Sequence, residues 1–207
     1  MSRVSAPDDP TRHSARRAGF VHLSVVYIVW GSTYLAIRLA VRPEGGFPPF
    51  ALGSVRLLLA GAMLLGWAAL RRQRVGLTRR EVVTLAVAGI LMWPLANGLV
   101  NWAERSADSS YAALLVGALP IWTAAIESVL DRRRPTLRFA LSLGIGFGGV
   151  VVLTVPGLVH AEAADAAAVL ALLVAPIAWA FGSVLQTRRP VSVGPVVSAA
   201  YLHLFGA

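Results

Sequence analysis

Seven apolar segments, separated by short polar connections, make up most of this 207-residue sequence. A bilayer core takes about 20 residues of helix to cross, and the first six segments have about that length. The seventh has reached 17 residues where the sequence stops. The pattern therefore predicts an all-α integral membrane protein, a polytopic bundle of transmembrane helices. The segments cover residues 20–41, 50–70, 82–102, 111–130, 137–155, 166–186 and 191–207.

Composition supports the same class of protein. Hydrophobic residues make up 57% of the sequence and charged residues 14%, whereas a soluble domain carries about 25% charged residues. The mean hydropathy is +0.67. With no cysteine in the sequence, disulfides and thiolate metal sites are excluded. The lipid bilayer is therefore the first expected partner.

The net charge of +9 and the absence of lysine raise the question of a nucleic-acid partner. Such a partner is expected to require a basic patch or stripe on a folded surface. Here the arginines lie in the short connections between apolar segments, which is typical of charges that set membrane topology. We therefore expect no nucleic acid as a partner.

The arginines alternate along the chain. Fourteen lie before the first segment or in the second, fourth and sixth connections, and two lie in the odd connections. Because arginine-rich connections stay on the cytoplasmic side, we predict a cytoplasmic N-terminus and a disordered cytoplasmic tail over residues 1–19. The fourteen are Arg3, Arg12, Arg16, Arg17, Arg71, Arg72, Arg74, Arg79, Arg80, Arg132, Arg133, Arg134, Arg188 and Arg189; the two are Arg42 and Arg105.

The sixth and seventh segments resemble the first and second. Residues 28–38 read I-V-W-G-S-T-Y-L-A-I-R and residues 177–188 read I-A-W-A-F-G-S-V-L-Q-T-R. Similarly, L-A-G-A at residues 59–62 matches L-F-G-A at residues 204–207. Five helices separate the two copies, so the second enters the membrane from the opposite side. This predicts an inverted repeat, a design typical of secondary transporters.

On these motifs the chain resembles the EamA family of the drug/metabolite transporter superfamily. The resemblance runs from about residue 21 to the C-terminus and is carried by short motifs in a specific order. These are W-G-S-T-Y at 30–34, Pro49 with Arg56, N-W-A-E-R at 101–105, Y-A-A-L-L-V-G-A-L-P-I-W-T-A at 111–124 and D-R-R-R-P-T at 131–136.

The resemblance implies ten helices in two inverted repeats of five. It also implies alternating-access transport of a small metabolite across a bacterial inner membrane, with export as the expected direction and no cofactor. We expect residues 20–155 to form the first repeat and residues 166–207 to begin the second. On this comparison the chain stops within the seventh helix and is expected to be truncated.

Polar and aromatic side chains recur at helical spacing on four of the predicted spans. A transporter of this class binds its substrate near the bilayer midplane between the repeats, and polar residues in a span usually face such a space. The alternative for each residue is packing or hydrogen bonding between helices. The predicted substrate-binding residues are Trp30, Thr33, Tyr34, Arg56, Trp93, Asn97, Asn101, Trp179 and Ser183; Pro120, Thr123 and Gln186 lie on the same stripes.

Arg56 is the most informative of these residues because it lies about 9 Å into its helix at 1.5 Å per residue. A charge near the centre of a membrane helix costs at least about 2.5 kcal/mol on insertion scales. Two interpretations follow: an anchor for an anionic substrate or a gate partner for Glu104, and alternatively snorkelling to the surface. Arg38 and Glu127 are expected to snorkel. Glu104 is expected to be solvated in its loop, and the alternative is a part in proton coupling or gating.

Prolines and glycines within the spans carry two further expectations. Pro94, Pro120 and Pro176 are expected to interrupt helices and to free backbone carbonyls near mid-span. The glycines at 144–149 spell G-x-G-x-x-G, which binds dinucleotides only within a strand–helix–strand unit. Inside an apolar span we expect Gly144 and Gly148 instead to allow close helix packing.

The alternatives to a transporter are an integral-membrane enzyme and a chain that does not transport by itself. An integral-membrane enzyme would need clustered His, Asp, Glu or Cys, but the four histidines have no ligand spacing and neither H-E-x-x-H nor G-x-S-x-G occurs. We therefore expect a protein that is not an enzyme. The remaining alternative is an inactive fragment, or a homo-oligomer that completes its transport pathway with a second copy.

Overall fold

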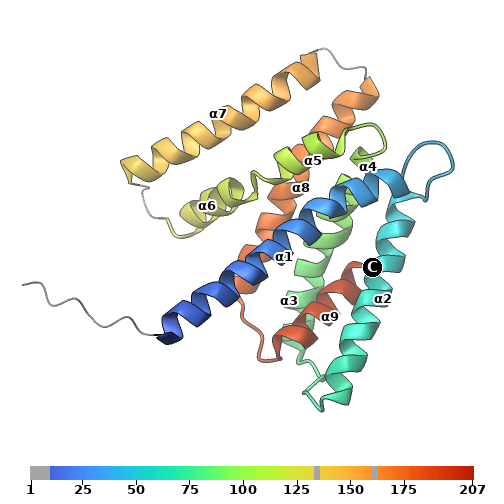
Figure 1. The fold of residues 1–207 in the computed structure, drawn as a ribbon, viewed down its shortest axis with the longest axis vertical. Helices are drawn as coiled ribbons and strands as arrows, with labels where there is room; N and C mark the ends of the chain where they lie inside the picture. The colour runs from blue at the N-terminus through green and yellow to red at the C-terminus, as the bar shows by residue number, and fades with distance from the viewer. Residues whose placement is uncertain (1–9, 133–135, 160–162) are drawn as a thin grey trace, which may run out of the picture.

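A computed structural model describes residues 10–132, 136–159 and 163–207, and all regular secondary structure within them is helical (Figure 1). The helices fall into seven groups that correspond to the seven apolar segments. They are α1 (Pro10–Ala40), α2 (Pro49–Leu70), α3 (Arg79–Ile90), η1 (Leu91–Asn97), α4 (Gly98–Ala103), α5 (Ser109–Val116), α6 (Leu119–Leu130), α7 (Leu137–Val159), α8 (Ala163–Arg188) and α9 (Pro195–Gly206).

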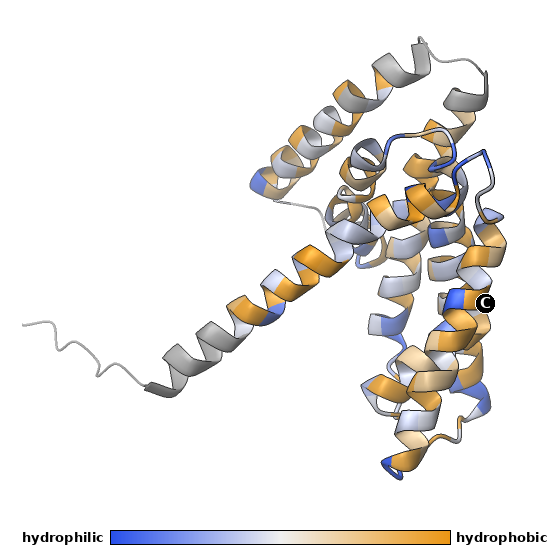
Figure 2. Ribbon diagram, turned by 45° about the vertical axis from the view of Figure 1, so that its right-hand side comes forward, coloured by the Kyte–Doolittle hydropathy of each residue, from blue (hydrophilic) through white to orange (hydrophobic). Residues whose placement is uncertain are grey.

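Five helical stretches of the described chain are long and apolar enough to cross a membrane. They are Gly19–Ala40, Pro49–Leu70, Arg79–Ala103, Ser109–Leu130 and Ala166–Arg188. The apolar parts of α7 and α9 are shorter. The expected all-helical, multi-pass membrane architecture is confirmed, whereas the inverted repeat and the truncation stay predictions. In Figure 2 apolar residues run along the helices and hydrophilic residues gather mostly in the connections.

α1 begins at Pro10, earlier than the apolar segment. Proline is well suited to the first helical position, because the amide hydrogen that it lacks would have no partner there. The predicted tail is therefore helical from residue 10, and residues 1–9 lie outside the described part. Arg133 and Arg134 also lie outside it.

Two of the predicted spans are not regular α-helices. The third runs α3–η1–α4, with a π-helical turn around Pro94. The fourth breaks between α5 and α6, just before Pro120. A proline within a helix lacks one backbone donor and clashes with the preceding turn, which accounts for both interruptions. Pro176, by contrast, lies inside a continuous α8.

One end of the bundle, where the described residues 71–78, 131, 132, 136 and 189–194 lie, is called here the arginine-rich end. Thr78 and Glu81 form a capping box that starts α3: the Glu81 N–H donates to Thr78 Oγ1 at 3.3 Å, and the Thr78 N–H donates to Glu81 Oε2 at 2.7 Å. Glu81 Oε1 accepts from the N–H and the hydroxyl of Ser192 at 2.8 and 2.6 Å. Arg74 pairs with Glu81 Oε2 at 3.3 Å. One buried carboxylate thus joins two connections that are far apart in sequence.

Glycines allow α9 to pack closely between α2 and α3 (Figure 1). A Cβ on Gly61 would lie 2.7 Å from Leu204 Cγ, and one on Gly89 would lie 2.7 Å from the carbonyl oxygen of Leu202. α8 approaches the third span in the same way, because a Cβ on Gly182 would lie 2.6 Å from Met92 Cγ. Small residues at such contacts are typical of membrane helices, and they fix the walls of the cavity described below.

The packing role predicted for Gly144 and Gly148 is wrong in the described structure. An added Cβ at either position would have no atom within 4 Å. Gly146 makes the close contact instead, since its Cβ would lie 2.5 Å from Ile121 Cδ1 of α6. The glycine pattern alone could not identify the helix face, because all of these glycines lie within two turns of α7.

A candidate substrate-binding cavity

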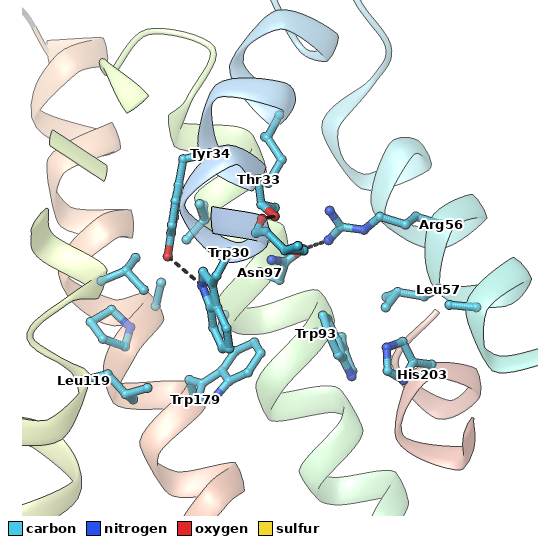
Figure 3. Close-up of a pocket in the computed structure, with 18 of the residues that line it drawn as sticks. Trp30, Thr33, Tyr34, Arg56, Leu57, Trp93, Asn97, Leu119, Trp179 and His203 are labelled. Carbon is cyan, nitrogen blue, oxygen red and sulfur yellow. Dashed lines mark hydrogen bonds between the residues drawn. The ribbon is translucent and has the colours of Figure 1, made fainter. Parts of the chain in front are cut away.

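A cavity of about 500 Å³ lies between α1, α2, η1, α4, α8 and α9 (Figure 3). It is lined mainly by aliphatic and aromatic side chains. Among its lining residues are Arg56 and His203, and no aspartate or glutamate. This size and this mixture of an apolar wall with a few polar groups are typical of small-molecule sites.

The polar part of the cavity is a contact between α2 and η1. Arg56 Nη2 donates to Asn97 Oδ1 at 2.6 Å, and both side chains line the cavity. Figure 3 shows the guanidinium directed at Asn97 across the space between the two helices. The structure thus pairs Arg56 with Asn97 and not with Glu104. A guanidinium has five N–H donors, so this bond leaves others free to meet a ligand.

Three tryptophans form a connected aromatic wall. Trp179 lies between the other two, with ring centroids 6.0 Å from Trp30 and 5.4 Å from Trp93. Trp30 Nε1 donates to the Tyr34 hydroxyl at 3.4 Å. Edge-to-face and tilted ring pairs at these separations stabilise one another, so the wall has a defined shape without a ligand.

His203 of α9 also lines the cavity and lies against Trp93, with ring centroids 4.5 Å apart (Figure 3). Its Nδ1 faces the Ala199 carbonyl oxygen at 2.6 Å, so that nitrogen carries the proton. The sequence interpretation did not include His203 among the site residues, because it looked only for pairs of histidines with metal-ligand spacing. The signal that could have found it is an ionisable residue within a membrane span.

The cavity brings together seven of the nine predicted binding residues: Trp30, Thr33, Tyr34, Arg56, Trp93, Asn97 and Trp179. Ser183 is not among its lining residues. Asn101 is fully buried and lines a separate small groove, where its Nδ2 donates to the Pro49 carbonyl oxygen at 3.4 Å. The π turn explains part of this separation, because it gives the helix an extra residue within one turn. A residue that strict α-helical spacing places on the same stripe beyond Asn97, such as Asn101, therefore does not face the cavity.

Other residues of the predicted stripes take part in helix contacts instead. Gln186 Nε2 lies 3.0 Å from the sulfur of Met92, and Thr123 Oγ1 donates to the Leu119 carbonyl oxygen at 3.0 Å. Neither lines the cavity, and Pro120 does not either. Within the described residues no group of three or more His, Asp or Glu is placed to hold a metal ion.

The expectation for Glu104 is corrected by the structure. Glu104 is not solvated: its exposed fraction is 0%. The reason is that α4 continues to Ala103, so the next residue lies at the end of the helix and packs within the bundle. Its backbone carbonyl accepts from Arg38 Nη1 at 2.5 Å, and Arg38 itself is partly exposed, so its snorkelling stays a prediction. Glu127 is exposed, as expected of a residue near the surface.

The fold is that of a multi-pass helical membrane protein, and the cavity between its helices is a candidate site for a small molecule. Residues 18–155 match the profile of the EamA-like transporter family, and the chain belongs to this family. Membership of a transporter family confirms that the protein is not of an enzyme class. The matched region is nearly the same as the predicted first repeat, residues 20–155.

Similar proteins with curated descriptions are likewise described as transporters or exporters. The chain is 32% identical over 181 residues to the uncharacterized inner membrane transporter YedA of Escherichia coli K12, covering 87% of this chain and 56% of that protein. An uncharacterized transporter of Archaeoglobus fulgidus is 23% identical over 84% of this chain and 61% of its own length. A probable terminal-alkyne amino-acid exporter of Streptantibioticus cattleyicolor is 25% identical over 65% of this chain and 44% of its own. The chain thus spans about half the length of these relatives. No solved structure matches its fold.

Proposed function

We propose that this chain transports a small organic metabolite across the inner membrane by alternating access, in the direction of export. Family membership and the relative described as an exporter support this assignment. The observation that carries it is the cavity itself, which holds seven predicted binding residues within one apolar space of about 500 Å³.

The substrate of this proposal has an anionic group and an apolar or aromatic body. Arg56 presents a positive charge to a cavity whose lining residues include no acidic side chain. Charge-assisted hydrogen bonds to a carboxylate are roughly twice as strong as neutral ones. The tryptophan wall offers flat apolar surfaces for the remainder of the molecule.

A series of matched probes tests the charge preference. Phenylacetate, 2-phenylethanol and phenylethylamine share an aromatic body and differ in charge. Because the three tryptophans of the wall adjoin the cavity, quenching of tryptophan fluorescence reports binding in lipid nanodiscs. We expect phenylacetate to bind most tightly and phenylethylamine least. Tightest binding of the amine would contradict an anion site.

Arg56 variants then test the anchor. A hydrogen bond to a charged group contributes about 1.5–3 kcal/mol, so Arg56→Ala is expected to weaken phenylacetate binding by about 10- to 100-fold. Arg56→Lys keeps the charge and is expected to retain part of the affinity. Arg105→Ala is the matched control, since this exposed arginine does not line the cavity. Equal binding by Arg56→Ala and Arg105→Ala would exclude Arg56 as the anchor.

Transport itself is measured as uptake of labelled phenylacetate into proteoliposomes that contain the 207-residue chain. Uptake that exceeds that of empty liposomes and is lost in Arg56→Ala supports the proposal. Binding without uptake would show that the cavity is a site but that this chain alone is not a carrier.

We infer in addition that α8 and α9 belong to a second, inverted copy of α1 and α2. The two sequence copies place Trp30 and Trp179 at equivalent positions, and these rings meet at 6.0 Å in the cavity wall. A contact between equivalent residues is expected near the axis of an inverted repeat. Trp30→Phe and Trp179→Phe are therefore expected to weaken phenylacetate binding to a similar degree.

Assembly with a second copy is also part of the proposal. Residues 19–32 of α1 are all exposed, although most of them are apolar. This surface suits lipid and equally suits another helix. The mass of the protein in nanodiscs distinguishes one copy from two.

A further inference from the structure

Glu104 lies at the end of the bundle opposite the arginine-rich end, directly after α4. Its side chain is fully buried, and neither carboxyl oxygen has a hydrogen-bond partner within the described part of the chain. A buried carboxylate without a partner is strongly disfavoured, because it has lost its water and gained no compensating contact. In the neutral form the same group is tolerated. The mechanism proposed above makes no use of this residue.

Glu104 contacts α1 through its backbone. Arg38 of α1 donates to the Glu104 carbonyl oxygen at 2.5 Å, so a guanidinium lies next to the carboxyl group without being bonded to it. Arg38 is one helical turn from Tyr34, which lines the cavity and is bonded to Trp30. A chain of contacts thus leads from Glu104 through α1 to the cavity wall.

Within the part of the chain that the structure describes, few other titratable groups lie near Glu104. Tyr34 interacts electrostatically with its charge, and Tyr111 of α5 is hydrogen-bonded to Thr154 of α7. Arg56 of α2 is engaged with Asn97. The remaining groups of the described residues on the adjoining elements are Arg42 and Glu44 after α1, and Arg105 and Asp108 after α4.

We propose that Glu104 is a proton-binding site that couples the movement of protons to the opening of the cavity. The ligand is a proton, since a metal ion would need several further ligands and no such group exists in the described residues. This inference rests on the proposed transport function and names the coupling ion for it.

The proposed switch has two arrangements. With a neutral carboxylic acid, Glu104 stays buried and Arg38 is held by the backbone carbonyl, as in this structure. Loss of the proton to water creates a carboxylate that must find a partner or leave the interior. The nearest cation, Arg38, then bonds the carboxylate, which displaces the end of α1 and with it Tyr34. Uptake of one proton from water on the outer side restores the first arrangement. One proton moves inward per cycle when the carboxylic acid releases it to the inner side through the cavity.

Burial raises the pKa of the Glu104 carboxyl to about 8, with the Arg38 cation acting in the opposite direction. The switch therefore operates near neutral pH. Infrared spectroscopy detects it without any substrate: the protein in lipid is expected to show the C=O band of a protonated carboxylic acid at about pH 6, lost on titration to about pH 10. The band should be absent in Glu104→Gln and unchanged in Glu127→Gln and Asp165→Asn. Its persistence in Glu104→Gln, or its absence from the unaltered protein at about pH 6, would overturn the proposal.

The movement of α1 is measured separately. The chain has no cysteine, so spin labels on Leu39→Cys and Ser106→Cys, both at exposed positions, report one distance across this contact. We expect the distance distribution to change with pH in the otherwise unaltered chain and to be independent of pH in Glu104→Gln. A distance that does not change while the carboxylic-acid band titrates would show a static acid and overturn the switch.

Phenylacetate binding at the same pH values links the switch to the cavity. A pH dependence that is lost in Glu104→Gln supports coupling, and an identical pH dependence in both proteins overturns it. If the chain binds no probe at any pH, the proposed substrate class fails. The infrared and distance measurements still decide the proton site in that case.

Discussion

Arg56 and Asn97 determine the chemistry of the cavity because each is the other's hydrogen-bond partner. A guanidinium in a membrane span is costly unless it is paired, and the 2.6 Å bond to Asn97 Oδ1 provides a neutral partner. A neutral partner leaves the positive charge uncompensated. The pair can therefore be stable in the empty cavity and still attract an anion.

Asn97 variants separate stability from binding. Asn97→Ala leaves the Arg56 guanidinium without its partner and is expected to lower the free energy of unfolding by about 1.5–3 kcal/mol. Asn97→Asp keeps an acceptor and adds a negative charge, so it should preserve stability but weaken phenylacetate binding. Denaturant unfolding in detergent and fluorescence quenching measure the two effects. Wild-type affinity in Asn97→Asp would show that the Arg56 charge does not contact the ligand.

Glu104 gives stability a definite pH dependence. The folded-state pKa of about 8 lies above the ordinary value of 4.5, so the folded protein binds the proton more tightly than the unfolded chain does. Stability from this group is fully present below about pH 4.5 and is lost as the pH rises through about 8. We expect the thermal unfolding midpoint to fall over this window and to fall less in Glu104→Gln. The exposed Glu127→Gln is the control, and a flat profile in the unaltered protein would contradict the assignment.

At the scale of elements, the π turn of η1 sets how the third span presents its side chains. π turns within α-helices are frequent at functional sites, and this one holds both Trp93 and Asn97 against the cavity. Its cause is local. Pro94 has no amide hydrogen to continue the α-helical pattern, so the backbone accommodates an additional residue there.

Replacement of Pro94 tests this dependence. Pro94→Ala restores an amide hydrogen that can bond the Ile90 carbonyl, which favours a regular α-helix and turns Asn97 away from Arg56. We expect phenylacetate binding to weaken while the circular dichroism spectrum still shows a helical protein. Pro176→Ala is the matched control, because α8 is continuous through that proline. Equal effects of the two substitutions would argue against a special role of the π turn.

The Glu81 contacts lend themselves to a similar test at the arginine-rich end. Its carboxylate accepts from both the backbone and the hydroxyl of Ser192 and pairs with Arg74. Glu81→Gln removes the charge from all of these bonds, so we expect a loss of about 1.5–3 kcal/mol in unfolding free energy. Ser192→Ala removes one hydroxyl and should cost less. Unchanged denaturation midpoints in Glu81→Gln would show that the two connections are not held together by this carboxylate.

The pattern of apolar and polar residues along the sequence predicted the helices better than it predicted the contacts between them. The seven apolar segments and the placement of seven of the nine predicted binding residues in the cavity follow from sequence, since length, hydropathy and i, i+4 spacing are local properties. The burial of Glu104 could not be predicted, because it depends on contacts between segments that are far apart in sequence, such as the one with Arg38. For the same reason His203 could be recognised only once α9 was placed beside Trp93.

At the scale of the whole molecule, the two ends of the bundle differ in charge as the alternating arginines require. The Arg74–Glu81 and Arg188–Asp131 pairs both lie at the arginine-rich end. At the opposite end the described contact is between Arg38 and a backbone carbonyl. Arginine-rich connections remain cytoplasmic, so the predicted orientation places the Glu104 site at the outer surface and the Glu81 contacts inside.

A pair of single cysteines decides this orientation, because the chain has none of its own. Glu44→Cys and Gln73→Cys are both at exposed positions, in the first and second connections. With a membrane-impermeant maleimide, intact cells should label Glu44→Cys at once and Gln73→Cys only after permeabilisation. The reverse pattern would place the N-terminus outside. Glu104 would then take its proton from the cytoplasm, and inward proton movement could no longer drive export by the proposed switch.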